Sequence, residues 1–304
     1  MEINGVYIDE TYAEAFGAYA GRVLITACNK TWALEAARSM TGFGTSVIGC
    51  GCEVAIEAIE PTDTPDDRPG VSVLLFAMSK KAVHEQLINR IGQCVMTAPT
   101  SACYNALEAE DRLSIGGKLK FFGDGFQISK RLDPLITGNG SGPRRFWRIP
   151  VMDGEFIVED RFGVQKGVAG GNFLLMGREL PGTLQAAERA IEAMRKVAGV
   201  IMPFPGGVVR SGSKVGSRYK FLNASSNTAF CPSLRRAVKS ELPEGVGAVL
   251  EIVIDGLTPE AVGEAMRVGI RAACGPGIVK ISAGNYGGKL GKHHFHLHQL
   301  LAEG

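Results

Sequence analysis

The stretch Ala248-Val-Leu-Glu-Ile-Val-Ile254 is one of the longest apolar runs of the chain and is typical of a buried strand. A segment from Pro259 to Ala273 follows with helical spacing, and its proline lies in the first turn, where a helix tolerates it. The short run Ile278-Val-Lys-Ile281 predicts the next strand. The sequence therefore predicts a strand, a helix and a strand at the end of the chain.

The same pattern occurs in the first half of the chain. Ala82-Val83-His84-Glu85, continuing to Ile91, matches Ala261-Val262-Gly263-Glu264, continuing to Ile270, at a constant offset of 179 residues. Each half predicts the order strand, helix, strand, strand, helix, strand, which is that of a ferredoxin-like, split βαβ lobe. We therefore expect an α+β fold of two related ferredoxin-like lobes, each an α/β sandwich, with domains at residues 1–150 and 151–304.

The expected elements follow from apolar runs, helical spacing and turn residues. In the first half they are strands at 22–27, 45–49, 71–76 and 94–97 and helices at 31–38 and 80–92. In the second half they are strands at 172–176, 200–201, 219–222, 248–254 and 278–281 and helices at 181–197 and 259–273. Residues 127–145 are polar and contain several glycines and prolines, which predicts a long loop between the halves.

Length and composition exclude several classes of protein. A chain of 304 residues with 45% apolar and 21% charged residues suits about two globular domains and does not suit a disordered chain. No run approaches the ~18 apolar residues of a membrane span, and the acidic N-terminus predicts no signal peptide. Seven thinly spread cysteines predict reduced thiols in the cytoplasm rather than a disulfide framework.

The segment from Ala193 to Ser240 contains no Asp or Glu but nine basic residues. These are Arg195, Lys196, Arg210, Lys214, Arg218, Lys220, Arg235, Arg236 and Lys239. Such a pattern predicts an anionic partner, which could be a phosphate, a polycarboxylate or a nucleic acid. The alternative is a basic face that meets only solvent.

Gly-rich polar loops supply the candidate binding residues. Motifs for dinucleotides, for Walker A phosphate binding and for a nucleophile elbow are absent from the sequence. The loops leave backbone amides accessible beside polar side chains, and such loops suit bound anions and developing oxyanions; the alternative is a set of tight turns between strands. The candidate substrate-binding residues are Gly170, Gly171, Asn172, Pro205, Gly206, Gly207, Ser211, Gly212, Ser213, Lys214, Arg218, Lys220, Asn285 and Tyr286.

Two features suggest a metal site, but we expect neither to bind one. Among the histidines at the end of the chain, His294, His296 and His298 alternate at strand spacing. The Cys50-Gly-Cys52 pair has no second cysteine pair to complete a tetrahedral site. We expect no metal and no bound prosthetic group.

Glu251 is the candidate catalytic residue. It lies inside an apolar strand, and its counterpart in the first half is Ser72, so the carboxyl group belongs to one half only. Burial would raise its pKa and make it an acid or base at neutral pH. The alternative is a strand whose Val249, Glu251 and Val253 face solvent. Asp124, in an Asp-Gly turn, is a weaker candidate.

The sequence resembles the formylmethanofuran:tetrahydromethanopterin formyltransferases of one-carbon metabolism nearly from end to end. The matching stretches together are highly specific. They are Met1-Glu-Ile-Asn-Gly5, Ile91-Gly-Gln-Cys-Val95, Thr97-Ala-Pro-Thr100, Gly117-Lys-Leu-Lys-Phe-Phe122, Ala169-Gly-Gly-Asn-Phe173, Pro203-Phe-Pro-Gly-Gly207, Ser211-Gly-Ser-Lys214, Lys220-Phe-Leu222, Phe230-Cys-Pro-Ser233, Ala265-Met-Arg-Val-Gly269 and Lys280-Ile-Ser-Ala-Gly-Asn-Tyr-Gly-Gly-Lys-Leu-Gly291.

The resemblance implies an N-formyltransferase that moves a formyl group between N5 of tetrahydromethanopterin and the amine of methanofuran or a similar carrier. It implies no prosthetic group, carriers with anionic tails, and a homodimer, a homotetramer or a hetero-oligomer with hydrolase subunits. It also implies a role for Glu251 near the formyl group. The family includes the D subunit of a bacterial formyltransferase/hydrolase complex, and the near-neutral charge and the thiols favour that branch over the acidic archaeal one.

Two other functions fit the general pattern less well. A non-catalytic scaffold subunit would not need the Gly-, Asn- and Lys-containing loops. Tandem ferredoxin-like RNA-binding domains read bases with exposed aromatic residues on central strands. The runs 71–76 and 248–254 offer almost none, and no RNP1-like motif occurs. We therefore expect no nucleic acid partner and no membrane partner.

Overall fold

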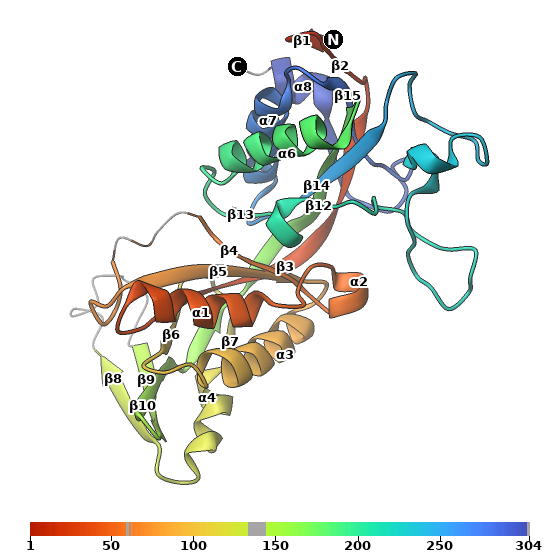
Figure 1. Cartoon of the computed structure of the whole chain (residues 1–304). Coiled ribbons are helices and arrows are strands. Elements are labelled where there is room, and N and C mark those ends of the chain that lie inside the picture. The colour runs from red at the N-terminus through yellow and green to blue at the C-terminus, as the bar shows by residue number, and fades with distance from the viewer. Residues whose placement is uncertain (59–60, 62, 133–143, 303–304) are drawn as a thin grey trace. The chain divides into compact units, whose positions relative to one another are not determined.

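The computed structural model describes residues 1–58, 61, 63–132 and 144–302. Most of the predicted loop at 127–145, including Gly138, Gly140, Gly142 and Pro143, lies outside these residues. The fold is mixed α/β (Figure 1). Within the described residues, no helix is both long enough and apolar enough to cross a bilayer.

The chain forms two compact units, whose boundaries differ from the predicted division after residue 150. The first, here called the C-terminal unit, contains residues 1–17 and 167–304, and the N-terminal unit contains residues 18–166. The start of the chain joins the C-terminal unit because Tyr7 and Ile8 pair in parallel with Lys280 and Ile281. Composition along the chain does not reveal a strand that pairs with another about 270 residues away.

The C-terminal unit contains the repeated order that the sequence predicts. Its strands and helices are β1 (Glu2–Ile3), β2 (Val6–Ile8), the start of β3 (Tyr12–Thr26), most of β12 (Gln165–Gly177), α6 (Leu180–Met194), β13 (Val200–Ile201), β14 (Ala248–Gly256), α7 (Pro259–Ala273), β15 (Ile278–Ser282), β16 (His293–His296) and α8 (Leu297–Ala302). The strands pair antiparallel in the order β13-β14-β12-β15.

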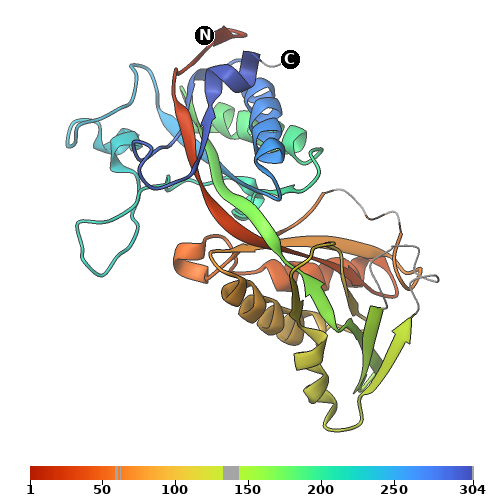
Figure 2. The same ribbon diagram turned by 180° about the vertical axis from the view of Figure 1, so that it is seen from behind.

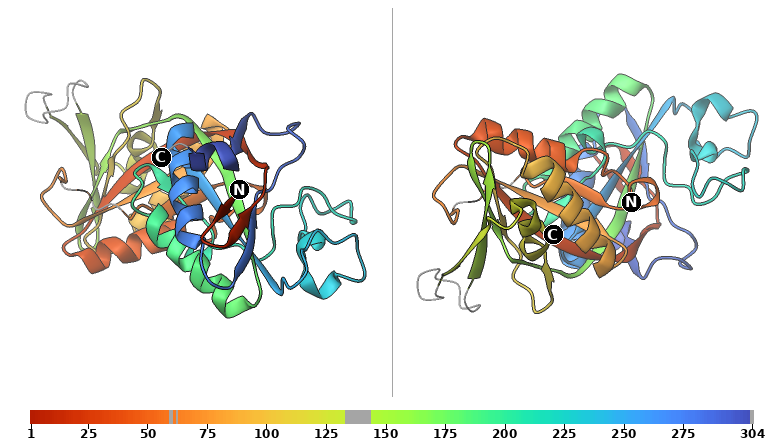
Figure 3. Two further views of the ribbon diagram at one scale, coloured as in Figure 1. Left: turned by 90° about the horizontal axis from the view of Figure 1, so that it is seen from above. Right: turned by 90° about the horizontal axis from the view of Figure 1, so that it is seen from below.

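Helices α6 and α7 cover one face of this sheet and run side by side (Figures 1 and 3). The Thr258 hydroxyl caps α7 by accepting the amide of Ala261 at 3.2 Å, as its place before Pro259 predicts. Alternate residues of β14, including Leu250 and Ile252, point into the core beneath the two helices. The helices approach closely at Gly269, where a Cβ atom would lie 2.5 Å from the Met194 sulfur.

Residues 202–247 form a long connection between β13 and β14. Its first residues, including Met202 and Val208, still pack against the core beneath α6 and α7, and most of the remainder lies on the other side of the sheet (Figure 2). Leu242 and Val246 of this connection pack on Leu174 and Met176 of β12. Their contact closes off part of the second sheet face, which is the face that carries the odd-numbered residues of β14.

The N-terminal unit repeats the strand order as β4-β5-β3-β6, again antiparallel. Its elements are the rest of β3, α1 (Lys30–Thr41), α2 (Val47–Cys50), β4 (Glu53–Ile56), β5 (Gly70–Ala77), α3 (Lys80–Arg90), the π-helix Ile91–Val95, β6 (Ala102–Asn105), β7 (Arg112–Ser114), α4 (Gly116–Leu119), β8 (Ile128–Leu132), β9 (Arg144–Val151), β10 (Gly154–Glu159) and β11 (Arg161–Gly163). The Asn29 side chain caps α1.

Three predicted strands are wrong. Residues 45–49 enter helix α2, because the Ser46 hydroxyl accepts the amide of Ile48. Residues 94–97 lie in and after the π-helix that extends α3, and the strand comes later, at β6. Residues 219–222 form an exposed turn of the 202–247 connection, between Val215 and Ala224, which pair as an isolated bridge.

Candidate active site

Glu251 lies in the middle of β14, on the sheet face away from α6 and α7. In register it faces Leu174 of β12, which in turn faces Ser282 of β15. Only 1% of Glu251 is exposed. The alternative in which this strand face meets solvent is therefore wrong, because the 202–247 connection covers it.

The Glu251 carboxyl group has one hydrogen-bonded oxygen and one free oxygen. The Ser213 hydroxyl donates to Oε1 at 2.7 Å. Oε2 is buried and has no hydrogen-bond partner among the described residues. Burial raises the pKa of Glu251 to about 7, and its hydrogen bonds with Ser213 only partly oppose this rise. The group therefore changes protonation state near neutral pH.

The main chain of Glu251 holds the Ser-Gly-Ser loop over its own side chain. The Val209 amide donates to the Glu251 carbonyl at 2.7 Å, and the Glu251 amide donates to the Val209 carbonyl at 2.9 Å. Ser211, Gly212 and Ser213 come just after Val209 and Arg210 in the chain. Because this bridge extends the sheet by one short segment, the loop is placed within hydrogen-bonding distance of the carboxyl group.

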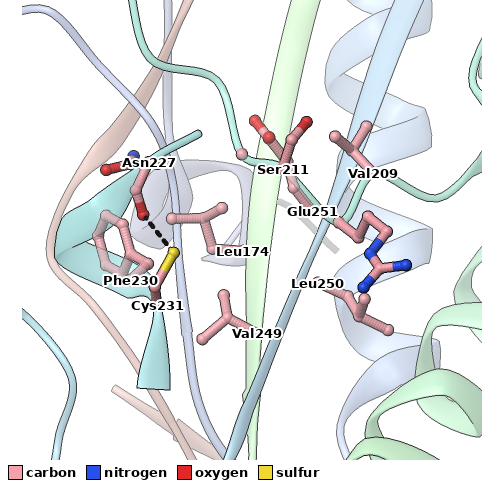
Figure 4. A pocket seen from close by; sticks show the side chains of 11 residues that line it. Leu174, Val209, Ser211, Asn227, Phe230, Cys231, Val249, Leu250 and Glu251 are labelled. Carbon is pink, nitrogen blue, oxygen red and sulfur yellow. Dashed lines mark hydrogen bonds between the residues drawn. The ribbon is translucent and has the colours of Figure 1, made fainter. Parts of the chain in front are cut away.

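Glu251 lines a pocket with about 300 Å³ of empty space. In Figure 4, Asn227, Phe230 and Cys231 gather on one side, and Glu251 and Ser211 on the other. The Cys231 thiol donates to the Asn227 carbonyl at 3.4 Å. The lining residues are Leu174, Val209, Arg210, Ser211, Gly212, Asn227, Phe230, Cys231, Val249, Leu250 and Glu251.

Asn172 joins two of the predicted binding loops. Its Oδ1 accepts the Gly284 amide at 2.6 Å, and its Nδ2 donates to the carbonyls of Gly284 and Gly170, each at 3.2 Å. The Gly170 amide donates to the buried Asp255 at 3.0 Å. These bonds fix the bulge at the start of β12 against the loop that follows β15.

Tyr286 and Asn285 lie on that loop. The Tyr286 ring is 6.0 Å from the Phe16 ring, measured between centroids. Burial raises the pKa of Tyr286, and the carboxylates of Glu251 and Glu14 raise it further, so the phenol stays protonated and can donate a hydrogen bond. Asn285 is exposed and donates to the Thr11 hydroxyl at 3.2 Å.

Sequence reasoning missed Glu14, a second buried carboxylate in the same unit. Its two oxygens accept the amides of Tyr286, Gly288, Leu290 and Gly291 at 2.6–2.8 Å. Burial by itself would raise the pKa of Glu14, but these four donors lower it to about 2. An acidic residue between Ala13 and Ala15 in an apolar strand was the signal that could have found it.

Four of the predicted binding residues lie away from Glu251, and two of them are tightly packed glycines. Gly171 packs against α7, where a Cβ atom would lie 2.4 Å from Val262. Gly207 has a positive φ of 88° and packs against Ile191, while Pro205 and Gly206 are exposed in the same turn. None of these four residues lines the Glu251 pocket.

The basic residues of the segment 193–240 differ in exposure and in their hydrogen-bond partners. Lys214 is half-buried and donates to the Thr228 hydroxyl at 3.4 Å. Arg218 and Lys220 are exposed on the turn 217–222, and Arg235 donates to the carbonyls of residues 242, 243 and 246. Of the nine, only Arg210 lines the pocket.

Other candidates lie outside this site. Asp124 is exposed in the N-terminal unit and has a left-handed backbone conformation that ends a short helix. His294 and His296 contact the Tyr12 ring, at 5.0 and 5.1 Å between centroids. Across the described residues, no three His, Cys, Asp or Glu side chains come together in a way that could hold a metal ion.

Comparisons with known proteins agree over the whole chain. A family model described as formylmethanofuran-tetrahydromethanopterin formyltransferase matches residues 1–151, and one described as FTR, proximal lobe, matches residues 154–300. The formylmethanofuran–tetrahydromethanopterin formyltransferase of Methylococcus capsulatus is 56% identical and covers 99% of this chain and 100% of its own length.

Solved structures give the same result. A chain in the formyltransferase/hydrolase complex from Methylorubrum extorquens, solved with methylofuran, is 48% identical with a TM-score of 0.94, over 99% of this chain and 98% of that one. The Methanosarcina barkeri formyltransferase is 50% identical with a TM-score of 0.90, over 99% and 100%. This chain therefore belongs to the formylmethanofuran–tetrahydromethanopterin formyltransferase family, whose reaction moves a formyl group between formylmethanofuran and tetrahydromethanopterin.

Proposed function

We propose that Glu251 is the acid/base of this formyl transfer. The observation that carries the proposal is the free, buried Oε2 of a carboxyl group that lines a pocket and titrates near neutral pH. A general acid/base works best when its pKa is close to the working pH. Glu251 is therefore suited both to accept and to return a proton.

The transfer needs one proton to move between two nitrogens. The amine of the accepting carrier attacks the formyl carbon, a C–N bond forms, and the carbonyl oxygen becomes an oxyanion. The ionised Glu251 takes the proton of the attacking amine and then delivers it to the departing nitrogen as the old C–N bond breaks. Ser213 holds Oε1, which leaves Oε2 to meet the nitrogens.

The loops beside Glu251 supply donors for the oxyanion. The protonated phenol of Tyr286 and the amides of Ser211 and Gly212 are the candidates, and Asn172 fixes the loop that carries Tyr286. Preorganised donors of this kind stabilise a tetrahedral intermediate without rearranging during the reaction.

The test is Glu251→Gln, which keeps the shape of the side chain but cannot exchange a proton. We expect kcat to fall about 10²–10⁴-fold with KM changed only a few-fold. Glu188→Gln, on the exposed face of α6, is the matched control and should retain full activity. If Glu251→Gln kept more than about a tenth of the wild-type kcat, the acid/base role would be wrong.

We further propose that Lys214, Arg218 and Lys220 bind the anionic tails that the family resemblance implies for the carriers. Arg218 and Lys220 are exposed, in a segment from Ala193 to Ser240 that has no acidic residue. Lys214→Ala should raise KM for at least one carrier, and more so at low ionic strength, because salt screens such attraction. An unchanged KM for both carriers at low salt would exclude this role.

We also propose how each unit is folded and how the chain assembles. We infer that each unit is a ferredoxin-like lobe, supported by the strand orders β13-β14-β12-β15 and β4-β5-β3-β6.

We propose that the chain forms a homo-oligomer or is a subunit of a complex like that of Methylorubrum extorquens. Its substrates would be methanofuran- or methylofuran-type carriers and tetrahydromethanopterin, with no bound cofactor. Its seven free thiols support a cytoplasmic location. A monomer mass by light scattering, together with full formyltransferase activity in the same sample, would rule out the oligomer.

A further inference from the structure

We propose that Glu14 is a positioning residue of the transferase site: its carboxylate gathers the loop at residues 285–291 and so fixes the Tyr286 hydroxyl beside Glu251. The inference rests on the proposed function of Glu251 and adds a residue that acts through the loop carrying Tyr286. Glu14 lies on the first part of β3, and all the groups involved belong to the C-terminal unit.

The contact is made entirely between one side chain and one loop. Oε2 accepts the amides of Tyr286 at 2.6 Å and Gly288 at 2.8 Å, and Oε1 accepts those of Leu290 and Gly291, both at 2.6 Å. Glu14 is fully buried. A buried carboxylate is tolerated only when it is well hydrogen-bonded, and four amide donors meet that need without a basic side chain.

The loop is shaped around this carboxylate. Gly287 and Gly288 have φ values of +71° and +72°, which turns successive amides toward one point. At Gly291 a Cβ atom would lie 2.8 Å from the Glu14 side chain and 2.4 Å from the Ala15 carbonyl, so only glycine fits there. The loop follows β15 directly and contains no helix or strand before β16. Asn172 and Thr11 hold its start, at Gly284 and Asn285, whereas the amides of Tyr286, Gly288, Leu290 and Gly291 all bond to Glu14.

The same contact places Tyr286 relative to Glu251. The loop leaves the sheet just after Ser282, which shares the Glu251 face of the sheet through Leu174. The Tyr286 backbone amide donates a hydrogen bond to Glu14. The Tyr286 ring contacts the ring of Phe16, which lies two residues after Glu14 on β3. The charge of Glu251 contributes to the raised pKa of the Tyr286 phenol. Without Glu14, the backbone of Tyr286 would lose the bond that sets its position.

Hydrogen exchange tests the contact without measuring activity. In the wild-type protein, a peptide covering residues 284–291 should exchange slowly, and Glu14→Gln should make it exchange at least about tenfold faster while α7 is unchanged. Glu159→Gln, which removes a buried carboxylate from the N-terminal unit, is the matched control and should leave this peptide protected. Unchanged protection in Glu14→Gln would overturn the proposal.

A double-mutant cycle tests the action through Tyr286. We expect Glu14→Gln and Tyr286→Phe each to lower kcat at least about tenfold, and the double variant to lose little more than either one, because both remove the same placed hydroxyl. Losses that multiply would show that Glu14 acts only through general stability and would overturn the proposal. If Glu14→Gln does not fold, Gly291→Ala disturbs the same contact from the loop and should give the same kinetic pattern.

The positioning role and the acid/base role can fail separately. The acid/base role is measured by Glu251→Gln in a protein whose loop is intact. The positioning role is measured by loop protection and by the cycle with Tyr286. A protein that keeps kcat in Glu251→Gln but loses loop protection and kcat in Glu14→Gln would refute the first and support the second.

Discussion

Glu14 and Glu251 are both buried carboxyl groups on strands of the same unit, yet their pKa values lie on opposite sides of the ordinary value. That of Glu14 is about 2 and that of Glu251 is about 7. Burial raises both. Glu14 accepts four backbone amides, which outweigh its burial, whereas Glu251 has only its contacts with Ser213, and one of its oxygens has no partner among the described residues. The number of amide donors therefore separates a permanent charge from a group that can exchange a proton.

The largest difference between the two should appear in thermal stability. At pH 7, Glu14→Gln should lower the Tm by at least about 5 °C, because hydrogen bonds to charged groups are worth roughly 1.5–3 kcal/mol each and 1 kcal/mol moves the Tm of a 150–250-residue domain by roughly 2–4 °C. Glu251→Gln should lower it by less than half as much, because it removes a group that is costly to ionise. Calorimetry measures both, and equal losses would contradict the comparison.

The pH dependence of stability should have opposite signs. The pKa of Glu251 is raised from 4.5 to about 7, so its contribution favours the fold below pH 4.5 and is lost as the pH rises through 7. The free energy of unfolding of Glu251→Gln, measured as its difference from wild type, should therefore increase by roughly 3 kcal/mol between about pH 4.5 and 8. The pKa of Glu14 is lowered to about 2, so its contribution is complete above pH 4.5 and is lost on acidification.

Denaturant unfolding at several pH values measures these slopes. The stability deficit of Glu14→Gln should shrink as the pH falls from about 4.5 toward 2. The change in stability of Glu251→Gln relative to wild type should instead build up as the pH rises from about 4.5 to 8 and then level off. Parallel curves for the two variants would mean that the two carboxyl groups share one environment, against the geometry described above. Glu188→Gln serves again as the exposed control.

The smallest effect should come from Ser213. Its hydroxyl lowers the pKa of Glu251, so Ser213→Ala should move the inflection of the kcat profile from about pH 7 to a higher pH. One hydrogen bond is worth roughly 0.5–1.5 kcal/mol, which corresponds to a shift of about one pH unit or less. The pH profile of formyl transfer measures it, and a shift toward lower pH would show that Ser213 does not donate to the carboxylate.

The local sequence signals predicted the helices and central strands well. The apolar run at 248–254 became β14, and the segment 259–273 is α7 with the bounds that its spacing and its proline indicated. The errors occurred where short signals were ambiguous. Residues 45–49 and 94–97 are apolar enough for strands, but a serine cap at Ser46 and the continuation of α3 after Arg90 made them helical.

The site was predicted only in part, for a physical reason. Glu251 was identifiable because a charged residue in an apolar strand is conspicuous, and its burial is confirmed. Ser213 and Asn172 were among the predicted residues, but their partners, Glu251 and Gly284, could not be derived because they are 38 and 112 residues away. Gly171 and Gly207, by contrast, are glycines because neighbouring side chains leave no room.

By itself, the sequence determined the repeated order of strands and helices and the position of Glu251 in the strand that became β14, because both depend on residues close together in the chain. It also determined the family, because stretches along the whole chain match it. Only the tertiary structure decided which residues join the C-terminal unit, which face of β14 is covered, and how Glu14 meets the loop at 285–291. These depend on contacts between segments that lie from about 40 to about 270 residues apart, and hydrogen bonds and burial at such separations leave no pattern in a single sequence.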